Sequence, residues 1–346
     1  MAMIPTTILT GFLGAGKTTL LNRVLQEPHG YKIAVIENEF GQENIDNEIL
    51  VQDSREQIVE MNNGCICCTV RGDLIVALTK LAQQRDAGTL AFDHVIIETT
   101  GLANPGPVAQ TFFMDEEVGA SYMLDAVITV VDARHGMDQL DRYEEAQRQA
   151  GFADRILLSK TDLATEDGIA QLTARLKRIN PRAPVARVDF GKVAIAEVLD
   201  IKGFNLNDKL EVDPAFLQAE QEEQEHVHDE HCGHGHEHGH GHASGHHTDD
   251  IAAFVFRSDR PFDPLKLDEF LGGLVQVYGP QMLRYKGVLA MQGADRKVVF
   301  QGVHQLMGSD LGAKWGENET PASKMVFIGK NLPKDIFIQG LQQCLV

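Results

Sequence analysis

Nine residues near the start of the chain, Gly11-Phe12-Leu13-Gly14-Ala15-Gly16-Lys17-Thr18-Thr19, set the expected architecture. They fit the pattern G-x-x-x-x-G-K-[ST] and lie between an apolar run and a helical stretch, which is the context that this pattern requires. Glycines let backbone N–H groups turn inward around phosphate oxygens, while the following helix points its positive end at the same group. We therefore predict a phosphate-binding loop made by Gly11, Gly14, Ala15, Gly16, Lys17, Thr18 and Thr19, with Lys17 on the β- and γ-phosphates and the Thr18 hydroxyl on Mg²⁺.

Short apolar runs rich in Val, Ile and Leu continue on both sides of this loop. They do not alternate with polar residues, as expected for strands that are buried on both faces. The predicted strands cover residues 6–10, 32–36, 94–98, 126–131, 155–159 and 185–188. The predicted helices between them cover residues 17–26, 73–84, 140–150 and 164–180. This alternation predicts an α/β fold, the doubly wound, mostly parallel sheet of a P-loop NTPase.

The composition changes after residue 200. Residues 211–250 hold eleven acidic residues and no Lys or Arg, and ten of the fourteen histidines lie between His226 and His247. Such a segment cannot build a core, so we expect residues 201–250 to be a disordered linker whose imidazoles bind transition metals. It separates a nucleotide-binding domain over residues 1–200 from a second domain over residues 251–346.

The second domain is expected to be a smaller α+β unit. Its predicted strands cover residues 251–256, 287–291, 297–303 and 325–329, and its predicted helices cover residues 263–278 and 332–345. No catalytic constellation is evident in it.

Charge and composition exclude several partners. The chain has 346 residues, of which 43% are hydrophobic and 23% charged, and its net charge is −19. A broad nucleic-acid or anionic-membrane surface would need clustered Lys and Arg, so neither partner is expected. No run approaches the ~18 apolar residues of a membrane span, and the N-terminus lacks a basic region with a cleavage site. We therefore expect a cytoplasmic protein.

Three of the five cysteines fall within four residues, at Cys65, Cys67 and Cys68. Neighbouring Cys67 and Cys68 are too close, at ~3.8 Å between Cα atoms, for comfortable disulfide geometry. Three thiolates form a soft site suited to Zn²⁺ or Cu(I), with a fourth position left open. Buried small residues or a redox pair are the alternatives.

Two further motifs follow predicted strands. Glu98-Thr-Thr-Gly101 ends the third strand, where a carboxylate can hold the Mg²⁺ shell and Gly101 can approach a γ-phosphate. A helix cap and turn is its structural alternative. Leu158-Ser159-Lys160-Thr161-Asp162 ends the fifth strand, where Asp162 can accept two hydrogen bonds from guanine and the Lys160 stem can cover the base. This motif favours GTP over ATP, although the same residues could also form an ordinary solvated turn.

Carboxylates also follow the second predicted strand. Glu37 or Glu39, in Glu37-Asn-Glu39-Phe-Gly-Gln42-Glu43, could reach the transition metal or Mg²⁺. A solvated acidic loop is the alternative interpretation.

With these residues in view, the chain resembles the CobW/YjiA family of P-loop GTPases, which includes zinc metallochaperones, and it is most similar to the YjiA branch. The matching stretches are TGFLGAGKTTLLN, YKIAVIENEFG, NNGCICCTVRGDL, VIIETTGLANPGP and DRILLSKTDL, with LRYKGVLAM, FQGVHQL and MVFIG near the C-terminus. They extend over nearly the whole chain outside residues 205–250.

The resemblance implies a slow, metal-responsive GTPase that delivers a transition metal, most often zinc, to client proteins. It implies metal ligands at Cys65, Cys67, Cys68 and Glu37. The chain departs from the YjiA-like pattern at Gln42, where that pattern has Glu, and Glu43 follows immediately. Ser159 stands where many GTPases have Asn.

The predicted function is therefore a metallochaperone that hydrolyses GTP to GDP and phosphate. Lys17, Thr18 and Glu98 are its catalytic candidates, and Gly101, Lys160 and Asp162 join the loop residues in binding nucleotide. The second domain is expected to bind an unknown client metalloprotein or to mediate homo-oligomer formation. Co²⁺ or Ni²⁺ could take the place of Zn²⁺ as the metal. Three alternative functions stay open: a cobalt chaperone for cobalamin synthesis; an ATP-dependent small-molecule kinase; and a metal buffer or sensor with a weak nucleotide site.

Overall fold

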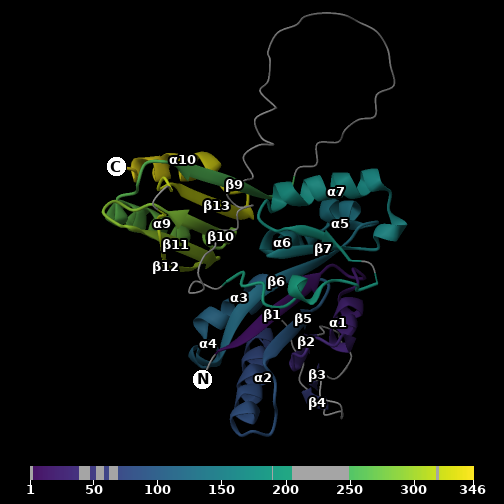
Figure 1. Cartoon of the computed structure of the whole chain (residues 1–346). Coiled ribbons are helices and arrows are strands. Elements are labelled where there is room, and N and C mark those ends of the chain that lie inside the picture. The colour runs from purple at the N-terminus through teal and green to yellow at the C-terminus, as the bar shows by residue number, and fades with distance from the viewer. Residues whose placement is uncertain are drawn as a thin grey trace, which may run out of the picture.

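The computed structural model describes residues 3–38, 47–51, 58–61, 69–188, 190–204, 249–316 and 319–346. These residues form an eight-stranded sheet and a five-stranded sheet, each covered by helices (Figure 1). The strands of the first sheet are β1 (Ile4–Gly11), β2 (Ile33–Asn38), β3 (Asn47–Val51), β4 (Ile58–Met61), β5 (His94–Thr99), β6 (Tyr122–Asp132), β7 (Arg155–Ser159) and β8 (Val185–Arg187). The helices of this part are α1 (Lys17–Gln26), α2 (Thr69–Asp86), α3 (Pro105–Met114), α4 (Glu116–Ser121), α5 (Gly136–Arg142), α6 (Glu144–Phe152) and α7 (Glu166–Ile179), with short 3₁₀ turns at Thr161–Leu163 and Ile195–Glu197.

The first sheet is parallel except at one edge. Its strand order is β4-β3-β2-β5-β1-β6-β7-β8, and all pairs from β2 to β8 are parallel. Only β3 and β4 form antiparallel pairs, with β2 and with each other. The prediction of a doubly wound, mostly parallel sheet is confirmed, and its six parallel strands coincide with the six apolar runs.

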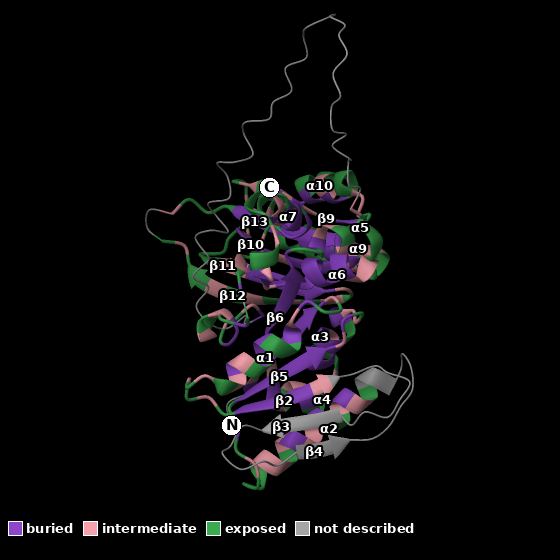
Figure 2. Ribbon diagram, turned by 90° about the vertical axis from the view of Figure 1, so that its right-hand side faces the viewer, coloured by how far each residue is buried: buried purple, intermediate pink, exposed green. Residues whose placement is uncertain are grey.

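Helices cover both faces of this sheet because successive side chains of its strands point to opposite sides. Ile8 of β1 packs with the face covered by α2, α3, α6 and α7, whereas Leu9 packs with α1 on the other face. The central strands β5, β1 and β6 are buried along almost their whole length (Figure 2). His94, on β5, is also buried, and its Nε2 lies 2.9 Å from the Thr7 hydroxyl. Burial lowers the pKa of His94 to about 4, so the ring is neutral and belongs to the core.

The second sheet is antiparallel, and two helices pack on one of its faces. Its strand order is β12-β11-β10-β13-β9, and its aromatic core includes Phe254, Phe327 and Phe337. Its elements are β9 (Ile251–Ser258), α9 (Pro264–Tyr278), β10 (Met282–Leu289), β11 (Arg296–Val303), β12 (Leu306–Lys314), β13 (Ser323–Lys330) and α10 (Lys334–Gln343). The predicted α+β domain is thereby confirmed, with β12 as a strand that was not predicted.

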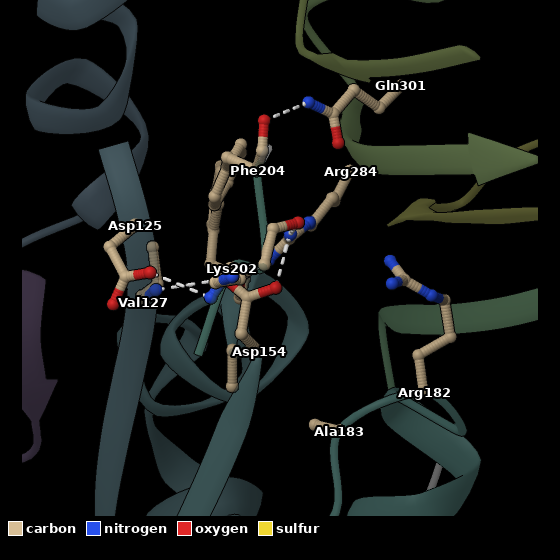
Figure 3. Close-up of polar contacts among 12 residues, drawn as sticks. Asp125, Val127, Asp154, Arg182, Ala183, Lys202, Phe204, Arg284 and Gln301 are labelled. Atoms are coloured by element: carbon tan, nitrogen blue, oxygen red, sulfur yellow. Dashed lines mark hydrogen bonds and ion pairs between the residues drawn. The ribbon is translucent and has the colours of Figure 1, made fainter. Parts of the chain in front are cut away.

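A buried ion pair joins the two sheets, as Figure 3 shows. Arg284 of β10 pairs with Asp154, and these two side chains are only 3% and 4% exposed. The Arg284 guanidinium also donates to the Phe152 and Gly203 carbonyls, at 2.9 and 3.1 Å. It lies 4.0 Å from the centre of the Phe204 ring. Both terminal nitrogens of this guanidinium therefore contact residues that precede the second domain in the chain.

The apolar core is also continuous between the two sheets. One cluster of buried side chains includes Phe152 of α6 together with Ile251, Leu283 and Ile328 of the second sheet. The stretch from Phe204 to Asp249 lies mostly outside the described residues, but both of its ends are fixed. The Phe204 carbonyl accepts a hydrogen bond from Gln301, and Asp249 pairs with the buried Arg175 of α7.

One predicted helix is divided in two. Residues 140–150 were expected to be continuous, but α5 ends at Arg142 and α6 begins at Glu144. Tyr143 between them is extended (φ −128°, ψ 116°), and its ring packs on Phe12 with centroids 4.7 Å apart. A contact with the predicted phosphate loop thus overrides local helix propensity. Among the described residues, no helix is both long and apolar enough to cross a membrane.

Candidate nucleotide and metal site

The glycine-rich loop connects β1 to α1, as the sequence predicts. Gly11, Gly14 and Gly16 have φ angles of 145°, 71° and 98°, a region that residues with a side chain rarely adopt. A Cβ on Gly11 would lie 2.3 Å from the Val130 carbonyl oxygen, whereas one on Gly14 would meet nothing within 4 Å. The loop therefore turns tightly against β6 and presents open backbone on its outer side, which is the geometry of an anion-binding loop.

Lys17 bends back over this loop. Its side chain is buried, and its Nζ donates to the Gly11 carbonyl at 2.8 Å. Burial lowers the pKa of Lys17, and the negative charge of Glu98 partly opposes that shift. A poorly solvated ammonium group at the head of an anion-binding loop is suited to phosphate oxygens.

Thr18 and Glu98 lie directly beside each other. The Thr18 hydroxyl donates to Glu98 Oε1 at 2.9 Å, although 80 residues separate them in sequence. Glu98 lies near the end of β5, next to β1 in the sheet. A hydroxyl and a carboxylate are the hard oxygen donors that Mg²⁺ prefers, so this donor set fits the predicted magnesium ion.

The loop that follows β5 packs on the phosphate-binding loop. A Cβ on Gly101 would lie 2.6 Å from the backbone nitrogen of Leu13 and 2.7 Å from its Cα. Only glycine fits this approach, so Gly101 lies at the phosphate end of the site. Asn104 then accepts a hydrogen bond from Gly106 N and caps α3, so the helix-cap interpretation of this stretch holds as well.

The predicted base-binding motif meets the same loop. The Ser159 hydroxyl donates to the Ala15 carbonyl at 2.6 Å, and Lys160 Nζ donates to the Gly14 carbonyl at 2.7 Å. Lys160 is held in the left-handed region (φ 54°). Asp162 is exposed in the 3₁₀ turn that follows. The motif thus flanks the phosphate loop on the side away from Glu98.

Asp132 belongs to this site but was not predicted from the sequence. It ends β6, is 2% exposed, and accepts a 2.7 Å hydrogen bond from Lys160 Nζ. The backbone N–H groups of Arg134 and His135 donate to its other oxygen at 2.9 and 3.1 Å. The available signal was its place at the end of a buried strand, where the carboxyl ends of parallel strands converge.

Glu37 lies at the same end of the sheet as Glu98, where the parallel strands finish. The two residues are register partners in the parallel strands β2 and β5, and Glu37 is partly buried. Cys65, Cys67 and Cys68 lie outside the described residues, as do Glu39, Gln42 and Glu43. Within the part of the chain that the structure describes, no three His, Cys, Asp or Glu residues form a group that could hold a metal ion.

The described strands still show where the cysteine segment attaches. Because β3 is antiparallel to both β2 and β4, β4 runs in the same direction as β2. It therefore finishes at the end of the sheet that carries Glu37 and Glu98. Cys65 follows the end of β4 at Met61 by four residues, and α2 begins one residue after Cys68.

Comparison with known proteins agrees with this geometry. Residues 5–187 match the nucleotide-binding domain of the CobW/HypB/UreG family, and residues 251–345 match the C-terminal domain of the cobalamin synthesis protein CobW. The zinc chaperone YjiA of Escherichia coli is 41% identical, with 97% of this chain and 96% of YjiA aligned. The zinc chaperone CobW of Pseudomonas aeruginosa is 33% identical, with 100% of this chain and 92% of CobW aligned.

The fold agrees as well. The crystal structure of the Zn(II)-bound YjiA GTPase from E. coli superposes with a TM-score of 0.78, covering 100% of both chains at 35% identity in that alignment. Taken with the loop geometry and the two matched domains, these similarities show that the chain belongs to the CobW/HypB/UreG family of nucleotide-binding proteins.

Proposed function

We propose that this protein is a GTP-hydrolysing metallochaperone that binds zinc at the Cys65, Cys67 and Cys68 segment and releases it to client proteins. One juxtaposition supports this proposal above all. Glu98, which accepts a hydrogen bond from Thr18 of the phosphate loop, pairs in register with Glu37 on the strand that leads to the metal-binding candidates. One nucleotide-site candidate, Glu98, and one metal-ligand candidate, Glu37, thus lie on adjacent strands. The zinc chaperone names of relatives and the zinc-bound YjiA GTPase structure support the same conclusion.

The hydrolysis step follows from the loop. Backbone N–H groups of residues 11–19 and the Lys17 ammonium hold the β- and γ-phosphates of GTP, while water attacks in line and GDP leaves. Thr18 and Glu98 would hold Mg²⁺, which when bound neutralises phosphate charge. Gly101 lets its backbone approach the γ-phosphate. Catalysis is mostly positioning and charge stabilisation, so we expect a slow intrinsic rate.

The division of labour follows the two domains. In this proposal residues 1–200 hydrolyse GTP, residues 201–250 recruit metal ions through their histidines, and residues 251–346 contact a client metalloprotein or a second copy of the chain. The protein acts in the cytoplasm. Cobalt or nickel could replace zinc as cargo, because imidazole and thiolate ligands accept these ions too.

The coupling of zinc to nucleotide tests this function. If GTP orders the loops attached to β2 and β4, zinc affinity should differ by about 5- to 150-fold between the GTP and GDP states, the usual range for coupled sites. The measurement is chelator competition for zinc with GDP and with a non-hydrolysable GTP analogue. Cys67→Ser should abolish the difference while nucleotide binding persists, because a hydroxyl is a poor ligand where a thiolate is needed.

A matched control uses the same substitution elsewhere. Cys344 is buried in the second domain, where its Sγ contacts the Gly340 carbonyl. Cys344→Ser should leave zinc affinity in both nucleotide states as in wild type. Equal zinc affinities in the two wild-type states would rule out nucleotide-gated transfer.

A second test concerns the base. Asp162→Asn removes a carboxylate that accepts two hydrogen bonds from guanine, and hydrogen bonds to charged groups contribute about 1.5–3 kcal/mol. We therefore expect the preference for GTP over ATP to fall by about 10- to 100-fold in nucleotide competition assays. Asp167→Asn, on the exposed first turn of α7, should leave it unchanged. A wild-type protein that binds ATP and GTP equally would contradict the assignment of GTP as substrate.

A further inference from the structure

The loop at residues 100–104 is held from two sides. On one side Gly101 packs on Leu13 of the phosphate-binding loop, so closely that no side chain fits between them. On the other side the loop meets helix α6. The contact between this loop and α6 therefore determines where the loop lies relative to the phosphate-binding loop.

Gln149 of α6 makes that contact. Its side chain is 1% exposed, and its amide donates to the Gly101 carbonyl at 3.1 Å and to the Ala103 carbonyl at 3.0 Å. Both N–H groups of this buried amide thus donate hydrogen bonds to one short loop. The Gln149 backbone is itself fixed, because its carbonyl accepts a 2.7 Å hydrogen bond from the Thr129 hydroxyl in β6.

Helix α6 is a rigid support for this contact. It is largely buried, as Figure 2 shows. Its residue Gly151 packs against Ile251, Leu283 and Ile328 of the second domain. Gln147 donates to the Leu140 carbonyl at 2.8 Å and accepts from Ile251 N at 3.2 Å. Lys330 of β13 pairs with Glu144 at the start of the helix. Gln149 therefore projects from a helix that packing and hydrogen bonds hold on several sides.

We propose that Gln149 is a positioning residue for recognition of the γ-phosphate of GTP. By holding the Gly101 and Ala103 carbonyls, it keeps the Gly101 backbone against the phosphate-binding loop, where it can approach a γ-phosphate. GDP has no γ-phosphate, so Gln149 contributes to the affinity for GTP and not to that for GDP. This inference rests on the proposed GTPase function.

The test compares two glutamines on the same helix. Gln149→Met keeps the length of the side chain and removes both donors, and Gln147→Met makes the same change two residues away, where the hydrogen bonds lead to Leu140 and Ile251. For Gln149→Met we expect about tenfold weaker binding of a non-hydrolysable GTP analogue, the effect of about one lost hydrogen bond, with GDP affinity changed less than twofold. For Gln147→Met the ratio of the two affinities should equal that of wild type.

A merely structural role would give a different result. Loosening of α6 would weaken the binding of the GTP analogue and of GDP to the same extent. An unchanged ratio of these two affinities in Gln149→Met would therefore overturn the proposal. A wild-type protein that neither binds nor hydrolyses GTP would instead overturn the GTPase function itself.

A measurement on the wild type covers the case in which Gln149→Met does not fold. The side-chain amide resonance of Gln149 should shift between the GDP and GTP-analogue complexes, while that of Gln147 should not. Identical Gln149 resonances in the two complexes would also overturn the proposal.

Discussion

Replacing Lys17 by Met should lower the rate of GTP hydrolysis at least about 100-fold. Methionine matches the length of the Lys17 side chain but carries neither its charge nor its hydrogen-bond donors. Lys17 is buried at the head of the loop, so no solvent-exposed cation can take its place cheaply. Removing one preorganised donor that faces developing charge costs about 10²- to 10³-fold in rate in other enzymes. Phosphate release at saturating GTP, together with nucleotide affinity, measures the effect.

The control for this substitution is Lys177→Met, because Lys177 is exposed on the last turn of α7. Its hydrolysis rate should match that of wild type. Near wild-type hydrolysis by Lys17→Met would show that the glycine-rich loop does not act through this lysine, and the catalytic assignment would be wrong.

Arg284→Met should lower the free energy of unfolding by about 3–5 kcal/mol. The substitution leaves Asp154 as an uncompensated buried carboxylate, and breaking a buried ion pair from one side typically has this cost. It also removes donors to the Phe152 and Gly203 carbonyls and the cation above the Phe204 ring. Denaturant unfolding followed by circular dichroism gives the change.

Two further variants separate charge from packing. Arg260 is exposed and contacts the Val346 carbonyl, so Arg260→Met should cost less than about 1 kcal/mol. Adding Asp154→Asn to Arg284→Met removes the unpaired charge and should restore part of the lost stability. A cost below about 1 kcal/mol for Arg284→Met alone would mean that water reaches Asp154 readily.

The parallel core and the phosphate loop could be predicted from sequence because their signals are local. Each buried strand is a continuous apolar run, and residues 11–19 carry their whole motif in nine positions. The antiparallel hairpin β3–β4 was missed, since NEILV and IVEM mix acidic and apolar residues. In the second domain β12 was missed because LMGSDLGAK includes two glycines and alternates in exposure at the sheet edge.

The site shows the same division. Lys17, Thr18, Glu98 and Gly101 were predicted from motifs, and the structure brings all four to one end of the sheet. Asp132 was not predicted, because a single Asp after a strand is common in sequences. Its place in the site is evident only from its contact with Lys160 in the structure. The ion pair between Arg284 and Asp154 could not be predicted from a local pattern either, because 130 residues separate the two partners.

Helix α6 has a consequence for the order in which the chain folds on the ribosome. Its outer side packs on Ile251, Leu283 and Ile328, all of which are synthesised after the nucleotide-binding part and the stretch at 205–248. Until they emerge, the nascent protein shows apolar surface around Gly151 and a carboxylate at Asp154 without its arginine. Transiently exposed apolar surface of this kind promotes aggregation. This surface of α6 therefore stays uncovered while the ribosome translates both the histidine-rich stretch and the second domain as far as Ile328.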